Sequence, residues 1–327
     1  LGTTERVSVR SNGQEGNDDS FAPSISADGR YVAFPSAATN LVAGDSNATW
    51  DVFVRDRLLG TTERVSVNSD EAQANDCSAY ASISADGRYV AFPSWATNLV
   101  PADSNAMADV FVRDRVLGTT ERVSVSGDEA EADNCSSDTS ISADGRCVAF
   151  QSYATNLVPG DTNAVADIFL RDRELGTTER VSVSSEEGEA NDTSSYSSIS
   201  GDGRYVAFHS NATNLVPGDT NGAVDAFVRD RLLGTTERVS VSSDEAEGND
   251  LSWAPSISGD GNCVAFYSCA TNLILDDTNV APDVFLRDRL LGTTARVSVS
   301  TAGAQANECS YETALNWDGR HVAFTSD

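Results

Sequence analysis

The segment from Ser24 to Phe34 reads SISADGRYVAF, and this stretch decides the fold because the chain repeats it at a fixed interval. Copies run over residues 82–92, 140–150, 198–208 and 256–266, each 58 residues after the last. A diverged sixth copy, ALNWDGRHVAF, runs over residues 314–324 at the same interval. A constant period of this length indicates a repeat architecture.

Each repeat contains four short strand-like segments and no helical periodicity, as residues 80–126 illustrate. Residues 80–84 and 89–92 flank Asp86-Gly87, a dipeptide that favours a tight β-hairpin. The third and fourth strands are expected at residues 109–113 and 121–125, where apolar and polar residues alternate. Four antiparallel strands in a unit of this size predict an all-β, six-bladed β-propeller rather than an open β-solenoid.

The two ends of the sequence predict how the ring closes. Residues 2–9 read as a fourth strand, whereas residues 312–327 read as a first and a second strand. We therefore predict one domain over residues 1–327, in which residues 1–10 join residues 312–327 to close the sixth blade and hide its edges. The last repeat lacks the counterpart of residues 38–58, which includes the third strand. Either the natural protein continues, or the gap accepts a strand from another chain.

The repeated motif resembles that of TolB-type (WD40-like) propellers, whose core is Ser-Pro-Asp-Gly-x-x-(Ile/Val)-Ala-Phe. Here Ala or Gly replaces the proline before the aspartate, as in Ala27 and Gly201, and the loops are longer. The resemblance covers the whole chain. It implies an exported, non-catalytic propeller that binds other proteins, or a propeller attached to a separate catalytic domain.

Charge narrows the classes of partner. The chain has 50 acidic residues against 22 basic ones, all of them arginine, for a formal net charge of −28. Such a surface repels phosphate backbones and anionic lipids, so we expect no nucleic-acid partner. Membrane insertion is not expected either, because no apolar run approaches the ~18 residues that a spanning helix needs. We expect a secreted or periplasmic protein whose signal peptide is absent from this chain.

Six cysteines do not identify the compartment. Cys77, Cys135 and Cys309 share one repeat position, and Cys147 and Cys263 share another. No CxxC or His-Cys cluster occurs, which argues against zinc. Packing roles and disulfides both remain open.

Acidic and amide residues recur in the loop between the second and third strands, as Asp-x-Asn-x-x-x-Asp. Oxygen ligands at short spacing suit calcium, whereas Asx-turns at the start of the third strand are the alternative. Acids of the fourth-to-first loop, such as Asp70-Glu71 and Asp128-Glu129, are expected on the same face. The candidate calcium ligands are Asp45, Asn47, Asp51, Asp103, Asn105, Asp109, Asp161, Asn163, Asp167, Asp219, Asn221, Asp225, Asp277, Asn279 and Asp283.

The Arg-Asp-Arg triplet that ends each third strand, as in residues 55–57, is expected to form ion pairs within and between blades. Ligand recognition should instead use residues that differ between blades. Aromatic residues at the entrance of the first strand are the candidates, with packing around the channel as the alternative: Phe21, Tyr80, Tyr196, Trp253 and Tyr311.

Catalysis has little support in the sequence. Only His209 and His321 are present, and no nucleophile-elbow, zinc-protease or phosphate-loop motif occurs. We predict a non-enzymatic propeller that binds a protein or glycan through its acidic loop face, with calcium as the one candidate cofactor. The alternatives are an assembly module completed by a strand-donating partner, and a hydrolase or lactonase.

Overall fold

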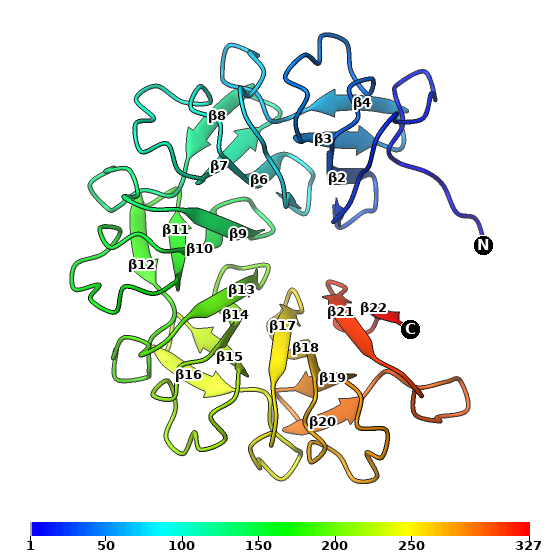
Figure 1. Ribbon diagram of the computed structural model, residues 1–327, viewed down its shortest axis with the longest axis vertical. Coiled ribbons are helices and arrows are strands. Elements are labelled where there is room, and N and C mark those ends of the chain that lie inside the picture. Colours follow the sequence, from blue (N-terminus) through cyan, green and yellow to red (C-terminus); the bar gives the residue numbers. More distant parts are fainter. Residues whose placement is uncertain (1) are drawn as a thin grey trace. The chain divides into compact units, whose positions relative to one another are not determined.

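The computed structural model describes residues 2–327, which form strands and no helix (Figure 1). Five sheets have four strands each in antiparallel sequence order, and the sixth has two. The prediction of an all-β propeller built from repeated four-stranded blades is confirmed.

The strand bounds repeat from blade to blade. The blades are β1 Ser24–Ile25, β2 Tyr31–Ser36, β3 Asp51–Asp56, β4 Thr61–Arg64; β5 Ser82–Ile83, β6 Tyr89–Ser94, β7 Asp109–Asp114, β8 Thr119–Arg122; β9 Ser136–Ile141, β10 Cys147–Ser152, β11 Asp167–Asp172, β12 Thr177–Arg180; β13 Ser194–Ile199, β14 Tyr205–Ser210, β15 Asp225–Asp230, β16 Thr235–Arg238; β17 Ser252–Ile257, β18 Cys263–Ser268, β19 Asp283–Asp288, β20 Thr293–Arg296; and β21 Ser310–Leu315, β22 Val322–Ser326.

The repeated motif builds the hairpin between the first two strands. Asp28 Oδ1 accepts hydrogen bonds from Ser26 Oγ (2.7 Å) and from the Arg30 backbone N–H (2.9 Å). Gly29 has φ +69°, a conformation that side chains with a Cβ disfavour. We call this end of each sheet, with the hairpin between the third and fourth strands, the turn end. The opposite end, with the longer connections, is the loop end.

Each four-stranded blade has an apolar core in which small side chains surround a buried phenylalanine of the second strand and one of the third. In the first blade, Phe34 of β2 lies opposite Phe53 of β3, and both are buried. Their ring centroids are 6.1 Å apart. Because Val-Ala-Phe recurs in every second strand, the same pair recurs as Phe92–Phe111, Phe208–Phe227 and Phe266–Phe285.

Successive blades are connected at their first strands, where β1 contacts β5, β5 contacts β9, β13 contacts β17 and β17 contacts β21. In the first, second, fourth and fifth blades, the residue before the Asp-Gly turn donates its N–H to the carbonyl of the equivalent residue in the next blade. Examples are Ala27 to Ala85 (3.0 Å) and Gly259 to Trp317 (2.9 Å). Backbone bonds of this kind need no particular side chain, so a diverged sixth repeat can still make them.

Trp317 of the sixth repeat covers one glycine of the fourth blade and one of the fifth. A Cβ on Gly201 would lie 1.7 Å from the Trp317 ring, and one on Gly259 would lie 2.3 Å from it. The same repeat position is alanine in the first three blades. Glycine at residues 201 and 259 therefore leaves the space that the Trp317 ring occupies.

Arginines at the turn end connect neighbouring blades, as the sequence predicted. The Tyr31 ring lies between the guanidinium groups of Arg30 and Arg115, at 4.7 and 4.5 Å from its centroid. Arg115 belongs to the second blade and also pairs with Glu63 of the first. Within the first blade, Asp56 accepts bonds from both Arg30 Nε (3.0 Å) and Arg30 Nη2 (2.7 Å). The Arg-Asp-Arg triplets thus stabilise the turn end.

The described chain divides into two compact units, residues 2–159 with 171–178 and residues 160–170 with 179–327. In the second unit, β22 pairs with β21, and the sixth sheet has these two strands. In the first unit, residues 2–7 have no strand assignment, and Val9 bridges Glu15. Closure of the ring by residues 1–10 stays a prediction, as does the single domain over residues 1–327.

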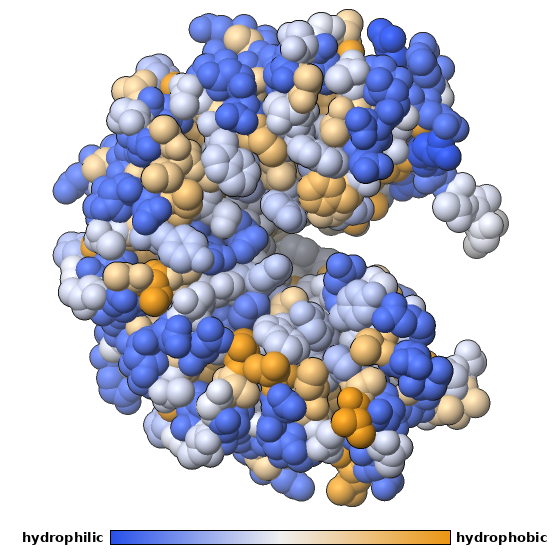
Figure 2. Space-filling model, viewed as in Figure 1, coloured by the Kyte–Doolittle hydropathy of each residue, from blue (hydrophilic) through white to orange (hydrophobic). Residues whose placement is uncertain are grey.

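The visible surface is mostly hydrophilic, in keeping with the acidic composition (Figure 2). No helix among residues 2–327 is long and apolar enough to cross a membrane. Cys77, Cys135, Cys263 and Cys309 are partly buried and form no disulfide in this structure.

Candidate functional site: carboxylate clusters and an aromatic pocket

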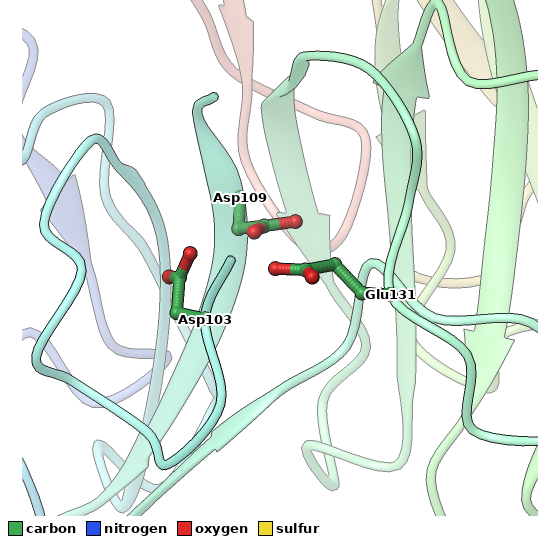
Figure 3. A group of neighbouring side chains, drawn as sticks. All are labelled: Asp103, Asp109 and Glu131. Atoms are coloured by element: carbon green, nitrogen blue, oxygen red, sulfur yellow. The ribbon is translucent and has the colours of Figure 1, made fainter. Parts of the chain in front are cut away.

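Three carboxylates converge at the loop end of the second blade (Figure 3). Asp103 comes from the β6–β7 loop, Asp109 begins β7, and Glu131 comes from the segment after β8. One oxygen of each lies within 4.8 Å of the others. Both aspartates were predicted from the sequence, whereas Glu131 was not. The third and fourth blades have the equivalent groups Asp161–Asp167–Glu189 and Asp219–Asp225–Glu247.

The asparagine of the Asp-x-Asn-x-x-x-Asp motif forms the turn. Asn105 Nδ2 donates to Asp109 Oδ2 (3.2 Å) and to the Ala132 carbonyl (2.9 Å). Its Oδ1 accepts the backbone N–H of Met107 (2.8 Å). Because a carbonyl can only accept, Ala132 fixes the amide so that its N–H₂ faces the cluster. The Asx-turn that the sequence offered as the alternative is therefore formed, and the same contacts recur at Asn47, Asn163, Asn221 and Asn279.

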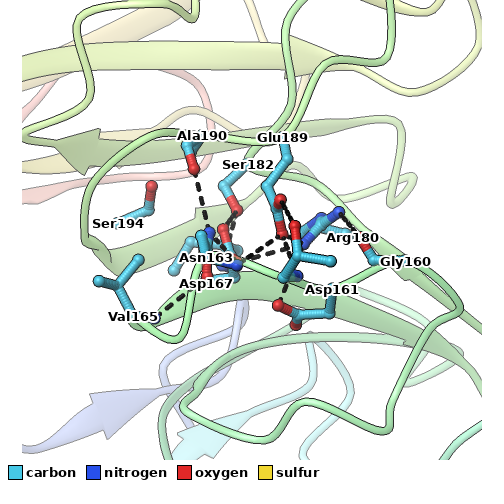
Figure 4. A network of polar contacts seen from close by, with 12 residues as sticks. Gly160, Asp161, Asn163, Val165, Asp167, Arg180, Ser182, Glu189, Ala190 and Ser194 are labelled. Atoms are coloured by element: carbon cyan, nitrogen blue, oxygen red, sulfur yellow. Dashed lines mark hydrogen bonds and ion pairs between the residues drawn. The ribbon is translucent and has the colours of Figure 1, made fainter.

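An arginine lies beside the carboxylates of each cluster. In the third blade, Arg180 Nη1 contacts Asp161 Oδ1 and Asp167 Oδ2, both at 3.4 Å, and also Glu189 (Figure 4). The Asp167 side chain is fully buried, and its second oxygen accepts a bond from Ser182. One guanidinium thus faces three carboxylates, which leaves a formal charge of −2 in the cluster.

The first and fifth blades have glutamine where the middle three have glutamate. Gln73 Nε2 donates to Asp45 Oδ1 (3.0 Å) and Asp51 Oδ2 (3.1 Å). Gln305 Nε2 donates in the same way to Asp277 (2.7 Å) and Asp283 (3.2 Å). An amide supplies protons to both aspartates, whereas a carboxylate cannot. Aligning the five repeats at the position of Gln73 would have shown that it is glutamine in the first and fifth blades and glutamate in the other three.

The glutamate clusters therefore leave some acceptors without donors. The side chains of Asp103 and Asp219 are only 2% and 1% exposed. The Oδ1 atom of each is buried and has no hydrogen-bond partner. Burial, with the negative charges nearby, raises the pKa of each of these aspartates to about 6. Asp161 has its pKa raised to about 6 for the same reasons, although Arg180 opposes the shift. Whether calcium binds these loops stays a prediction.

Some of the acids that were expected at the loop end lie near the turn end of the next blade. Glu71 pairs with Arg113, the penultimate residue of β7 in the next blade, and Glu129 pairs with Arg171 in the same way. The prediction that Asp70-Glu71 and its equivalents face the loop end with the Asp-x-Asn motif was wrong for these glutamates. The segment after the fourth strand reaches across to the next blade, which periodicity alone does not reveal. Glu187 and Glu245 repeat the arrangement with Arg229 and Arg287.

The predicted aromatic residues occupy two adjacent repeat positions at an irregularity in the first strand. The β17–β18 register shifts between Trp253 and Ser256, so two residues project where a regular strand places one. Ala254 has φ +45° and Tyr196, at the same position of the preceding blade, has φ +53°. A bulge of this kind redirects side chains. Phe21, Trp253 and Tyr311 share the first position, and Tyr80 and Tyr196 share the second.

Tyr196, Trp253 and Tyr311 line one pocket of about 670 Å³ in the second unit. Tyr196 stacks on His209, with centroids 5.1 Å apart, and Trp253 lies 5.4 Å from Tyr267. Burial lowers the pKa of His209 to about 4, so the imidazole is neutral at neutral pH. Its Nδ1 accepts the Ala254 N–H (3.3 Å). The remaining lining residues are Ala254, Pro282, Cys309, Glu312 and Asp327.

The other two predicted aromatics lie together in the first unit. Phe21 makes edge contacts with Trp50 (4.9 Å) and with Tyr80 (5.6 Å). Phe21 and Tyr80 remain 37% and 52% exposed. Sequence reasoning missed His209 and Tyr267 as pocket residues. Both occupy a second-strand position that is proline in the first two blades, so their departure from the repeat was the available signal.

No protein-family model and no curated protein matches this sequence. Solved structures do match. A putative TolB from Agrobacterium tumefaciens is 18% identical with a TM-score of 0.54, covering 95% of this chain and 91% of that one. The β-propeller domain of the Trilobed protease from Pyrococcus furiosus is 13% identical with a TM-score of 0.56, covering 95% and 79%.

An acylaminoacyl peptidase from Pyrococcus horikoshii is 14% identical with a TM-score of 0.56, covering 94% of this chain but 43% of that one. The likeness at these identities is one of fold, and it spans a putative TolB and parts of peptidases alike. By its fold, this chain is a TolB-like β-propeller.

Proposed function

We propose that this chain is a non-catalytic, exported propeller that binds a glycan or protein ligand in its aromatic pocket at the loop end. The observation that carries the proposal is the convergence of Tyr196, Trp253 and Tyr311, from three blades, on one pocket. Concave sites lined by aromatic faces and a few polar groups are typical of ligand binding. Two carboxylates in the lining, Glu312 and Asp327, could accept hydrogen bonds from ligand hydroxyl or amide groups.

The polar groups of the pocket support binding rather than turnover. The His209 ring is stacked on Tyr196, and its Nδ1 is occupied by a backbone N–H. Tyr311 Oη donates to Asp327 Oδ1 (3.0 Å), which engages one of the two acids. Because Nδ1 accepts a hydrogen bond, the neutral ring carries its proton on Nε2 and has no free ring nitrogen to act as a general base. Export is supported by the sequence resemblance and by the lysine-free, acidic composition.

A screen with an oligosaccharide array and a peptide library tests the proposal. A ligand found there should lose affinity by tenfold or more, about 1.4 kcal/mol, when Trp253→Ala removes one wall of the pocket. Trp95→Ala is the matched control, because Trp95 is 43% exposed and lies outside the pocket. Equal losses in both variants would refute the pocket, and hydrolysis of a ligand by the wild type would refute the non-catalytic assignment.

A further inference from the structure

The aromatic pocket of the second unit contains carboxylates and no positively charged side chain. Glu312 and Asp327 line it together with the aromatic rings, whereas no arginine of residues 2–327 is part of the lining. The one lining histidine, His209, is neutral at neutral pH because burial lowers its pKa to about 4. The lining therefore has a formal charge of −2, and a ligand with a positive charge would complement it.

The two carboxylates are held by neutral groups. Glu312 Oε2 accepts a hydrogen bond from Thr325 Oγ1 (3.1 Å), and Asp327 Oδ1 accepts one from Tyr311 Oη (3.0 Å). The arginines of β19 and β20 pair with other acids. Hydroxyl donors orient the two carboxylates without neutralising them, so their charge is left for a ligand.

Comparison with the first unit shows what is special about this pocket. Phe21, Trp50 and Tyr80 lie in contact there, with ring centroids 4.9 and 5.6 Å apart. In the second unit the residues at the same repeat positions, in the same order, are Trp253, Pro282 and Glu312. A proline and a carboxylate thus replace two mutually packed rings, and all three replacements line the pocket.

The bulge in the first strand places Glu312 in the lining. The register of β21 and β22 shifts between Tyr311 and Ala314, and Glu312 has φ +54°. Tyr196 and Ala254 occupy the same position of the two preceding blades, and both also line the pocket. Because Ala254 comes from the middle blade of the three, its short side chain leaves space between Tyr196 and Glu312.

The turn end shows how rings of this chain accommodate cations. The Tyr205 ring lies between the guanidinium groups of Arg204 and Arg289, at 4.7 and 4.5 Å from its centroid. In the described part of the chain, no guanidinium lies over the ring of Trp253 or Tyr311. Since the face of an aromatic ring attracts positive charge, these two rings provide a second kind of cation contact beside the carboxylates.

Electrostatics favour a basic protein over a neutral glycan as the ligand. Burial raises the pKa of Tyr267, and the nearby Glu312 carboxylate acts in the same direction. A neutral sugar would leave the formal charge of the lining uncompensated, whereas an ammonium or guanidinium group would neutralise part of it. At longer range, the net charge of −28 attracts basic partners and speeds their association.

We propose that the pocket binds a positively charged side chain, lysine or arginine, of a partner protein. This inference rests on the proposed function, which places the ligand in this pocket. The cation lies against the rings of Trp253 and Tyr311 and pairs with Glu312. The volume of about 670 Å³ also accommodates the aliphatic stem of the side chain and neighbouring peptide groups.

Capped glycine peptides with one central lysine or arginine test the proposal, with norleucine and citrulline peptides as their uncharged analogues. In ligand-observed NMR titrations, each charged peptide should bind the wild type about tenfold or more tightly than its analogue. Glu312→Gln should abolish that difference and leave the affinities of the uncharged peptides unchanged, because the amide keeps the shape of the side chain and removes its charge.

Glu308→Gln is the matched control, because Glu308 is an exposed acid of the same segment outside the pocket lining. It should leave all affinities unchanged, and a loss equal to that of Glu312→Gln would overturn the proposal in favour of long-range attraction alone.

Three further outcomes separate this inference from the proposed function. Equal binding of charged and uncharged peptides would overturn the inference, and the pocket would stand if Trp253→Ala weakened both. Tighter binding of cellohexaose than of either charged peptide, lost in Trp253→Ala, would overturn the inference and assign the pocket to a glycan. Binding that Trp253→Ala leaves unchanged for every probe would overturn both.

Discussion

The two ends of each blade bury charge in opposite ways. At the turn end, single acids pair with single arginines, as in Asp56 with Arg30 and Glu63 with Arg115. At the loop end of the second blade, three carboxylates face one arginine. The turn end is nearly the same in every blade, whereas the loop end varies in its Gln or Glu and in its aromatic residues. Uniform pairing suits a scaffold, and local variation suits recognition.

The largest effect should come from disrupting the turn end sterically. Gly87 has φ +73°, and a Cβ there would lie 2.1 Å from the Tyr31 ring that the two arginines hold in place. Gly87→Ala should cost about 3 kcal/mol of unfolding free energy from backbone strain plus overlap. Gly118→Ala, with φ +69° and no atom closer than 3.4 Å, isolates the strain at about 1 kcal/mol. Equal denaturant midpoints in the two variants would contradict the packing role of Tyr31.

Acid should weaken the turn end. The hydrogen bond from Arg30 lowers the pKa of Asp56 to about 2. A lowered folded-state pKa adds stability above the unfolded value of about 3.9, and that stability is lost as pH falls toward 2. Asp56→Asn should therefore cost about 2 kcal/mol at about pH 5 and almost nothing at about pH 2. A constant difference between variant and wild type across this range would contradict the ion pair.

A smaller effect is expected at Gly259, where crowding occurs without strain. Its φ lies outside the left-handed region, so an alanine would meet only the Trp317 ring. Because Trp317 is 52% exposed and can move, Gly259→Ala should cost about 1 kcal/mol. The same substitution in a Trp317→Ala background should cost nothing, and chemical denaturation of the four proteins measures the coupling. An undiminished cost in that background would assign it to the backbone.

The smallest effect is expected at the hairpin tips of the turn end. Leu232 and Leu233 are 74% and 67% exposed. Replacing both with serine should change the unfolding free energy by less than about 0.5 kcal/mol, because little apolar area is buried there. A clear loss of stability would show that these tips are covered in solution, and the turn end would then contain a contact surface in addition to its ion pairs.

Sequence reasoning reached the scaffold more fully than the site. The 58-residue period fixed the blades because each strand and turn follows from local residue types, as in Asp28-Gly29. The repeat pattern identified the aspartates of the Asp-x-Asn-x-x-x-Asp loop but missed Glu131. The contact between Glu131 and these aspartates joins segments more than twenty residues apart in the sequence. Three of the five aromatic candidates meet in one pocket, whereas the partners His209 and Tyr267 lie on another strand.

Trp317 has a consequence for how nearly identical repeats find their places during folding. Any blade could in principle pair with the wrong neighbour, since their strands and turns are almost interchangeable. The indole needs glycine at the equivalent position of its neighbours, and residues 201 and 259 provide it while Ala27, Ala85 and Ala143 do not. The Trp317 ring thus packs without steric overlap against the fourth and fifth repeats, whereas an alanine at the same position would overlap with it. A single large side chain therefore favours one order of the repeats over the others during folding.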